Sequence, residues 1–473
     1  MPLPTIPSGN VASALPTGFN VDNSCRFNDD DTQTMHVTPS SSGDNKTWTL
    51  SMWFKRGNLG SNQYLATAAY GNGGRYTEIW FNTSDELVIY GGAYNVSSTS
   101  VNLNMETKRV FRDVSAWYSL IIAFDLTDST ESNRVKVYIN GTLEPHANFT
   151  QSGSSSSATI PAQDSTTFFN TTTQALTMFA NGTSGATSFD GYMAEVVLID
   201  GTQYAATSFG EFDEDSPTIF KPIDVSGLTF GTNGFYLDFE DSSNLGNNAA
   251  SGSADLTEVD LAAADQATDT PTNNFCTLNP LAAANNQPTF SEGNCQAVSG
   301  GGWYGNLGTF AVSAGKWYWE VKNTSTGGNF HGVIADYVNF DDATVYNEVG
   351  ATSYSKDDGG EVHYGADSTT ADYGSTDQND ILGIALNMDD KQISFYDNGS
   401  AIVSNFALDD ASNLDFVIPF AFEWNATVQY NFGGCSAFAL SSAAQDENGY
   451  GNFEYAPPSG YYALCTKNLA EYG

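Results

Sequence analysis

Cysteine and histidine are scarce in this chain of 473 residues. The five cysteines are Cys25, Cys276, Cys295, Cys435 and Cys465. None is arranged as C-x-x-C, so the sequence predicts neither a zinc ribbon nor a disulfide framework, and we expect most of the thiols to be buried. Two disulfides stay open at this stage, Cys276 with Cys295 and Cys435 with Cys465. The four histidines are scattered and lack the i, i+4 spacing of a helical zinc site.

Basic residues are also few, since 16 Lys and Arg face 55 Asp and Glu and give a net charge of −39. Such a negative field repels a phosphate backbone, so we expect no nucleic-acid partner. An acidic surface with little Lys suits a marine or saline setting, where salt shortens the Debye length to about 5 Å or less. The alternative is that the acidity serves only to keep the protein soluble.

Long apolar runs are missing as well. Residues 1–7 (MPLPTIP) contain neither a basic segment nor a continuous apolar one, so they do not resemble a secretory signal. No window approaches 18 uninterrupted apolar residues, and we therefore expect no membrane insertion. The sequence predicts synthesis in a cytoplasm.

Signatures of catalysis are absent too. There is neither a G-x-S-x-G elbow nor a Walker A loop. Retaining glycosidases need two carboxyl groups about 5–5.5 Å apart, which a strand supplies as Glu-x-Asp-x-Glu or Glu-x-Asp-x-x-Glu. Residues 211–215 (EFDED) come nearest to this pattern, but Ser216 stands where the general acid is needed. We therefore expect a protein that is not an enzyme.

What the chain does contain is a series of short strand-like runs separated by Gly, Asn, Asp and Ser. After an N-terminal arm over residues 1–24, apolar or alternating runs occur at regular spacing and indicate sheet. These runs cover residues 48–54 (WTLSMWF), 64–68, 76–81, 86–90, 117–124, 135–139 and 189–201. The run at 135–139 leads into Asn140-Gly141, the dipeptide most typical of a tight hairpin.

Four of these motifs, in this order, resemble the laminin-G-like members of the concanavalin-like lectin superfamily. They are WTLSMWF at 48–54, Trp117-Tyr118, VYING at 137–141 and FDGY at 189–192. The resemblance implies a lectin-like β-sandwich, a jelly roll, over residues 25–215. Residues 216–294 are polar, Ala-rich and rich in turns, and we expect them to form a connector.

The second half of the chain resembles a SPRY domain over residues 295–440. The motifs that carry this resemblance are GKWYWEV at 315–321, ILGIALNM at 381–388, QISFYDNG at 392–399, FVIPFAF at 416–422 and TVQYNFG at 427–433. Residues 441–473 then form a C-terminal extension. The expected fold class is all-β, with two antiparallel β-sandwiches in tandem.

Residues 455–469 and 270–275 resemble segments of structural proteins from aquatic tailed bacteriophages. This resemblance implies a non-enzymatic protein of the virion surface, acting as a tail fibre or receptor-binding component. Its implied partners are other virion proteins and a host cell-surface glycan or protein, and it is expected to form homo-oligomers. Two alternatives are a capsid decoration or head fibre protein and a glycan-degrading enzyme of the concanavalin-like superfamily.

Binding by such sandwiches uses loops or aromatic side chains that stack on sugar rings. The candidate exposed aromatic residues are Tyr70, Tyr90, Tyr94, Trp303, Tyr304, Tyr354 and Tyr364. No cofactor is expected, although laminin-G-like domains often bind calcium at a sandwich rim. Residues 28–31 (NDDD) and Asp409-Asp410 carry the hard oxygen ligands that calcium prefers, and solvated turns are the alternative interpretation of both segments.

Overall fold

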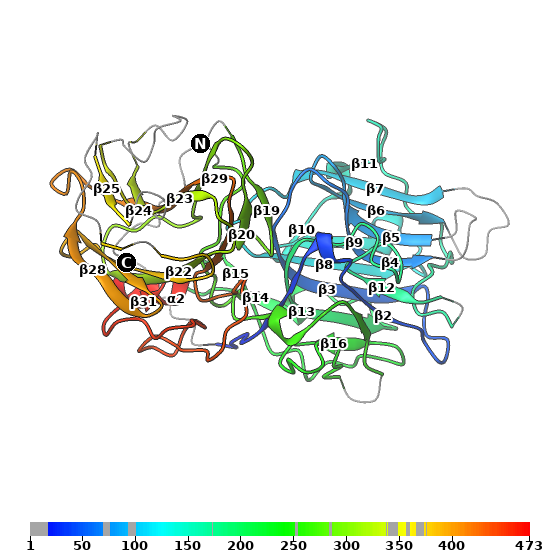
Figure 1. The fold of residues 1–473 in the computed structure, drawn as a ribbon. Helices are drawn as coiled ribbons and strands as arrows, with labels where there is room; N and C mark the ends of the chain where they lie inside the picture. The colour runs from blue at the N-terminus through cyan, green and yellow to red at the C-terminus, as the bar shows by residue number, and fades with distance from the viewer. Residues whose placement is uncertain are drawn as a thin grey trace. The chain divides into compact units, whose positions relative to one another are not determined.

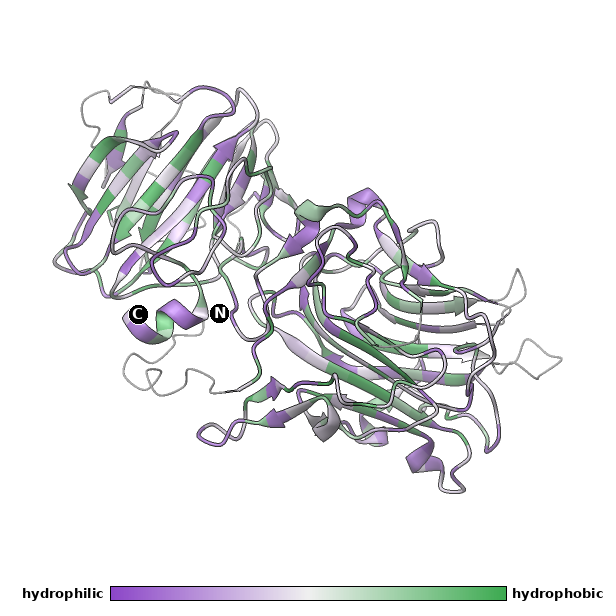
Figure 2. Ribbon diagram, turned by 90° about the horizontal axis from the view of Figure 1, so that it is seen from below, coloured by the Kyte–Doolittle hydropathy of each residue, from purple (hydrophilic) through white to green (hydrophobic). Residues whose placement is uncertain are grey.

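The chain forms two compact units in a computed structural model, Gly18–Thr272 and Asn273–Gly473 (Figure 1). The structure describes residues 18–69, 76–92, 101–172, 174–250, 254–282, 286–336, 338, 349–355, 360–365, 373–374 and 376–473. In each unit, hydrophobic residues are concentrated along the strands (Figure 2). Two antiparallel sheets face each other in both units, which confirms the expected pair of sandwiches.

Sheet A of the first unit has the strand order β10-β9-β8-β3-β13-β1-β18, and β16 also pairs with β13. Its strands are β1 (Ser24–Phe27), β3 (Thr47–Arg56), β8 (Tyr118–Asp125), β9 (Val135–Ile139), β10 (Thr142–Leu143), β13 (Gly191–Asp200), β16 (Phe235–Leu237) and β18 (Gln266–Ala267). Asn140 and Gly141 both have positive φ between β9 and β10, as the hairpin dipeptide predicted.

Sheet B has the order β11-β7-β6-β5-β4-β12-β2-β17. Its strands are β2 (Thr34–Val37), β4 (Gln63–Ala69), β5 (Tyr76–Phe81), β6 (Glu86–Gly92), β7 (Val101–Val110), β11 (Phe149–Thr150), β12 (Leu176–Met178) and β17 (Thr257–Val259). The remaining elements of this unit are the hairpin β14 (Gly210–Phe212) and β15 (Phe220–Pro222), the helix α1 (Glu131–Arg134), and single 3-10 turns at Asp29–Asp31, His146–Asn148, Ala206–Ser208 and Ala263–Asp265.

The main core of the first unit lies between sheets A and B. From β3, Trp48, Leu50 and Phe54 enter this core, whereas Trp53 belongs to a second cluster on the outer side of sheet A. Both faces of β3 and β13 are therefore buried over almost their whole length. On β5 of sheet B, by contrast, buried and partly exposed residues alternate, so one face of this strand is partly exposed.

Residues 216–272, expected to form a connector, are instead part of the first unit. In this segment, β16 pairs with β13 and β18 pairs with β1, both in sheet A, while β17 pairs with β2 in sheet B. The segment therefore contributes three strands to the first sandwich. The Lys55 ammonium and the Asp269 carboxylate also form an ion pair at 2.8 Å, with both side chains 1% exposed. A buried charge needs such a partner, so the Lys55 side chain of β3 depends on Asp269 for its stability.

The second unit is built from sheets C and D. Sheet C has the order β19-β20-β30-β22-β26-β27-β28, and sheet D has the order β21-β29-β23-β24-β25. The strands of sheet C are β19 (Thr289–Ser291), β20 (Gln296–Val298), β22 (Lys316–Asn323), β26 (Ile381–Asn387), β27 (Gln392–Asp397), β28 (Ser400–Ala407) and β30 (Thr427–Asn431). Those of sheet D are β21 (Trp303–Leu307), β23 (Gly328–Ala335), β24 (Ala351–Ser355), β25 (Val362–Tyr364) and β29 (Val417–Trp424).

A polar cluster lies in the interior of this second sandwich. The Tyr430 hydroxyl donates to Glu423 Oε1 at 2.9 Å, and Asn306 Nδ2 donates to the same oxygen at 3.2 Å. Glu423 is fully buried, and burial raises the pKa of its carboxyl group to about 8. The group is therefore a neutral acid at neutral pH, which removes most of the cost of burying it.

Residues 441–473, expected to extend beyond the second sandwich, pack onto it. The short strand β31 (Tyr462–Ala463) pairs in parallel with β22, and the helix α2 (Thr466–Tyr472) follows. The buried Glu320 carboxylate of β22 accepts hydrogen bonds from the backbone N–H groups of Glu454 and Tyr455, at 2.9 and 2.8 Å. One buried side chain thus anchors the final segment to sheet C.

The two ends of the second unit meet. Phe275 and Cys465 form an isolated antiparallel bridge, and the backbone N–H of Thr466 donates to the carbonyl of Asn274 at 2.8 Å. Cys276 N–H donates likewise to the Leu464 carbonyl at 3.0 Å. Residues 273–294 therefore begin the second sandwich, although the sequence placed them in the connector.

All five cysteines are buried, as the sequence predicted for most of them. Among the helices of the described residues, none is long and apolar enough to cross a membrane.

Candidate functional site

The outer face of sheet B carries a group of aromatic side chains centred on β5. Tyr76, Glu78 and Trp80 are partly exposed, whereas the residues between them are buried in the sandwich core. This alternation follows from the pleat of a strand, which turns successive side chains to opposite faces. β5 thus presents two rings with a carboxylate between them.

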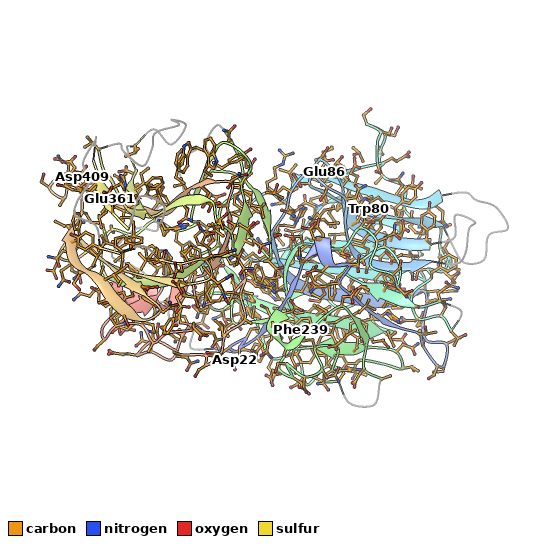
Figure 3. All side chains as sticks on the ribbon, in the orientation of Figure 1. Asp22, Trp80, Glu86, Phe239, Glu361 and Asp409 are labelled. Carbon is orange, nitrogen blue, oxygen red and sulfur yellow. The ribbon has the colours of Figure 1, made fainter. Side chains whose placement is uncertain are left out.

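Neighbouring strands add two further rings. Tyr64 on β4 lies opposite Trp80, and Tyr90 on β6 lies opposite Glu78. The Tyr64 and Trp80 rings stack at 5.4 Å between centroids, and the Tyr76 and Tyr90 rings stack at 5.8 Å. An edge contact at 6.0 Å between Trp80 and Tyr90 joins the two pairs. We call Tyr64, Tyr76, Trp80 and Tyr90, with Glu78 among them, the aromatic platform; Trp80 is labelled among the strands of sheet B in Figure 3.

Glu78 is the charged residue of the platform. Desolvation by its surroundings raises the pKa of its carboxyl group to about 7, and no hydrogen bond from another described residue lowers it. Burial also raises the pKa of the Tyr64 phenol to about 12, with the Glu78 charge as the next cause. The pKa of Tyr76 is raised in the same direction by burial, Tyr90 and Glu78. The carboxyl group is thus electrostatically linked to the rings around it.

The platform has a polar rim on the side of β6 and β7. Asn82 Nδ2 donates to a carboxylate oxygen of Glu86 at 3.1 Å and to one of Glu106 at 3.0 Å. Asn104 lies opposite Tyr90 in the register of β6 and β7. Amide and carboxylate groups of this kind can orient the hydroxyl or amino groups of a ligand that stacks on the rings.

Two carboxylates of this face, those of Glu78 and Glu106, come from different strands. Glu106 lies two strands away from Glu78, opposite Val88, which itself pairs with Trp80. Strand spacing and rise place the two backbone positions about 12 Å apart. This face therefore combines a stacking surface with one carboxyl group among the rings and two more, of Glu86 and Glu106, at the rim.

Among the sequence candidates of the first unit, Tyr90 belongs to the platform. Tyr70 and Tyr94 lie outside the described residues. The sequence analysis missed Tyr64, Tyr76, Glu78 and Trp80, although the alternation within residues 76–81 was a usable signal. Reading that alternation face by face would have separated the partly exposed residues from the core residues.

In the second unit, the expected exposure of Tyr354 is wrong. Its side chain is 1% exposed, because it lies in the core against Phe395 at 5.4 Å and its hydroxyl donates to the Gly374 carbonyl. Tyr304 is partly exposed on β21 and lies opposite Glu423. Tyr364 is partly exposed on β25, with an edge contact to Phe406 at 5.3 Å.

Trp303 forms part of a second aromatic group, on the outer face of sheet D. Its ring stacks on that of Phe422, with the centroids 5.1 Å apart. It also contacts Trp424, which is 41% exposed, edge-on with the centroids 5.6 Å apart. β21 and β25 are opposite edges of sheet D, so the structure does not bring Trp303 and Tyr364 together. Trp424 is a further exposed aromatic residue that the sequence analysis missed.

The acidic segments considered for calcium have roles within the fold. Asp29, Asp30 and Asp31 form a 3-10 turn, and the Asn28 side chain accepts from the Asp30 N–H. Asp409 Oδ2 accepts from Gly350 N–H at 2.7 Å. Within the part of the chain that the structure describes, no three His, Cys, Asp or Glu side chains gather as a metal site would require.

The segment 211–215, weighed for catalysis, lies in the β14–β15 hairpin region. The Lys221 ammonium lies 3.4 Å from both the Glu211 and the Asp213 carboxylates. This shared cation links the two carboxylates across the hairpin.

Comparison with known proteins agrees with both sandwiches. A family model described as the concanavalin A-like lectin/glucanases superfamily matches residues 29–206, and the SPRY domain model matches residues 316–435. No curated protein matches the sequence.

Three solved structures with similarity to the chain have low TM-scores. The SPRY domain of human HERC1 is 18% identical, with 34% of this chain and 99% of that one covered and a TM-score of 0.26. The mouse laminin alpha1 chain, domains LG4-5, is 9% identical, with 93% and 96% covered and a TM-score of 0.29. A heptameric SAP-like pentraxin from Limulus polyphemus is 11% identical, with 40% and 81% covered and a TM-score of 0.25. Two family models and the observed strand pairing together show that the chain carries a laminin-G or concanavalin-like lectin domain followed by a SPRY domain.

Proposed function

We propose that this is a non-enzymatic binding protein whose lectin-like domain binds glycans on the aromatic platform. The observation that carries the proposal is the set of four rings on adjacent strands, joined by contacts of 5.4 to 6.0 Å. Pyranose rings present apolar C–H faces that stack on aromatic rings, and each such ring contributes large contact area at little entropic cost. The rim of Asn82, Glu86 and Glu106 supplies hydrogen-bonding groups beside the rings.

The test is a glycan-binding measurement with Trp80→Ala. Because Trp80 contacts both Tyr64 and Tyr90, its loss divides the platform, and we expect glycan affinity to fall about tenfold or more. Trp424→Ala is the matched control, since it removes an exposed tryptophan from sheet D and should leave this binding unchanged. Glycan binding that survives Trp80→Ala would place the site elsewhere.

We further propose that this binding takes place at the surface of a tailed-phage virion, after synthesis in the host cytoplasm. The support is the resemblance of residues 270–275 and 455–469 to aquatic phage structural proteins, together with the acidic composition. A tail fibre or receptor-binding component is the favoured role and a capsid decoration protein the alternative. Labelling of purified particles tests the location, because a protein absent from the virion cannot act there, and copy number separates tail from capsid.

A second candidate function is glycan cleavage, favoured by one observation. The pKa of Glu78, raised to about 7 by desolvation, is in the range of a general acid near neutral pH. Incubation of the protein with a panel of bacterial surface polysaccharides decides between the two functions. Release of oligosaccharides that Glu78→Gln abolishes would establish the enzyme and end the non-enzymatic proposal.

A further inference from the structure

Glu78 lies at the centre of the aromatic platform rather than at its edge. Tyr76 and Trp80 are two positions away on either side along the same face of β5. Tyr90 lies directly opposite on β6, and Thr67 lies directly opposite on β4. The two stacked ring pairs therefore enclose the carboxyl group between them.

This carboxyl group has no cation paired with it among the described residues. On β7, Lys108 donates to the Ala147 carbonyl at 2.8 Å, and Arg109 pairs with Glu144 at 3.1 Å. The neighbouring groups on the rim include two more carboxylates, Glu86 and Glu106, held by one amide. Among the described residues, this partly desolvated carboxyl group therefore lacks the cation that such a group normally has.

A positively charged ligand would both pair with the Glu78 carboxylate and contact the aromatic rings around it. An ammonium group beside Glu78 would form an ion pair in a site from which the rings exclude much of the water. The same group would face ring π-systems, which attract cations most strongly where both are desolvated. The net charge of −39 also attracts a cationic polymer, but that field is spread over the surface and screened within about 8 Å at physiological salt, so it does not select the platform. Neutral sugars gain the stacking contacts and the hydrogen bonds of the rim, but not the ion pair.

We infer that the aromatic platform binds amino sugars with a free, protonated amine, the sugar ring stacking on the aromatic side chains and the ammonium group lying against Glu78. This inference rests on the proposed glycan-binding function and names the ligand class of that site. Glu78 is then the residue that selects cationic over neutral or N-acetylated glycans.

The experiment measures calorimetric binding of three oligosaccharides of equal length to the full-length protein. The probes are β-1,4-linked oligomers of glucosamine, of N-acetylglucosamine and of glucose. The protein variants are wild type, Glu78→Gln, Trp80→Ala and Glu131→Gln, the last removing an exposed carboxylate from α1 as a matched charge control. Circular dichroism checks that each variant is folded.

We expect the glucosamine oligomer to bind wild type at least about tenfold more tightly than the other two probes. Glu78→Gln should remove this preference without weakening the binding of neutral oligomers, Trp80→Ala should weaken all binding, and Glu131→Gln should change nothing. Equal binding of charged and neutral oligomers, or a preference that survives Glu78→Gln, overturns the inference while leaving the glycan-binding proposal intact. Binding of none of the three probes to wild type overturns the inference as well, and a wider glycan array then decides whether the proposed function fails with it.

Discussion

At the scale of single residues, Glu78 shows how an aromatic surface changes the chemistry of a carboxyl group. The pKa of this group is raised to about 7 by desolvation, above the unfolded value of 4.5. The folded state then binds more protons than the unfolded state between these two values, so folding stability falls as the pH rises from about 4.5 to about 7. Above a pH of about 7 the stability contributed by protonation of Glu78 has been lost completely.

Replacement of Glu78 by Gln removes this dependence. We expect Glu78→Gln to be more stable than wild type at pH 8, on the order of 1–2 kcal/mol after allowance for solvent screening, and similar to wild type at pH 4. Urea unfolding across the pH range measures the difference, and Glu131→Gln should follow the wild-type profile. A Glu78→Gln profile parallel to wild type would show that the platform does not desolvate the carboxyl group.

A second prediction at the residue scale concerns Tyr430, in the interior of the SPRY sandwich, and its contribution to stability. Tyr430→Phe removes the hydroxyl that donates to the buried Glu423 carboxyl, which leaves a polar group partly unsatisfied. We expect a loss of about 1–3 kcal/mol in the free energy of unfolding, measured by chemical denaturation.

Tyr396→Phe is the matched control. Tyr396 lies on β27 of sheet C, and its side chain is partly exposed. Removal of its hydroxyl should change stability by less than about 0.5 kcal/mol. If both substitutions lowered the free energy of unfolding equally, the hydrogen bond from Tyr430 to Glu423 would make no specific contribution to stability.

The sequence could predict part of the site at this scale. The apolar pattern of residues 76–81 predicts this strand, and its alternation distinguishes the face of Tyr76, Glu78 and Trp80 from the core face. The stacking of Tyr64 on Trp80 could not be foreseen, since it depends on the register of β4 with β5, including an irregularity between Tyr64 and Ala66. Register is a property of pairing between strands, and no single strand encodes it.

At the scale of elements, long strands were easier to foresee than short ones. β3 and β13 each span ten residues with both faces buried, and their apolar runs are evident in the sequence. β16, β17 and β18 have only two or three residues each. Their strand conformation comes from pairing with a preformed sheet, which is why residues 216–272 were misread as a connector.

The Glu320 carboxylate should determine how firmly residues 441–473 are attached to sheet C. Glu320→Ala removes the acceptor for the N–H groups of Glu454 and Tyr455, so residues 441–473 should detach from sheet C more easily. We expect a loss of about 2–4 kcal/mol in unfolding free energy and faster proteolysis within this segment. Glu471→Ala, on the exposed face of α2, should change neither. Unchanged proteolysis in Glu320→Ala would mean that other contacts hold the segment.

At the scale of the whole molecule, the structure predicts where the chain can be divided. Fragments 18–272 and 273–473 should each fold cooperatively, because each contains a complete sandwich. The fragment 25–215 should not, since it lacks β16, β17 and β18 and leaves the buried Lys55 ammonium without Asp269. An uncompensated buried charge costs about 3–5 kcal/mol. Thermal unfolding followed by circular dichroism distinguishes the fragments, and a cooperative transition for 25–215 would contradict this division.

The first and last segments of the second unit meet, which affects how this unit can be combined with other domains. Residues 274–276 and 464–466 are neighbouring rungs of one small ladder, and α2 follows with only seven residues, so the first and last segments of this unit lie close together. A module of this kind can be inserted into a surface loop of another domain without stretching that loop open. The same closure suits circular permutation, in which a short linker joins the old ends and new termini are opened in a distant turn.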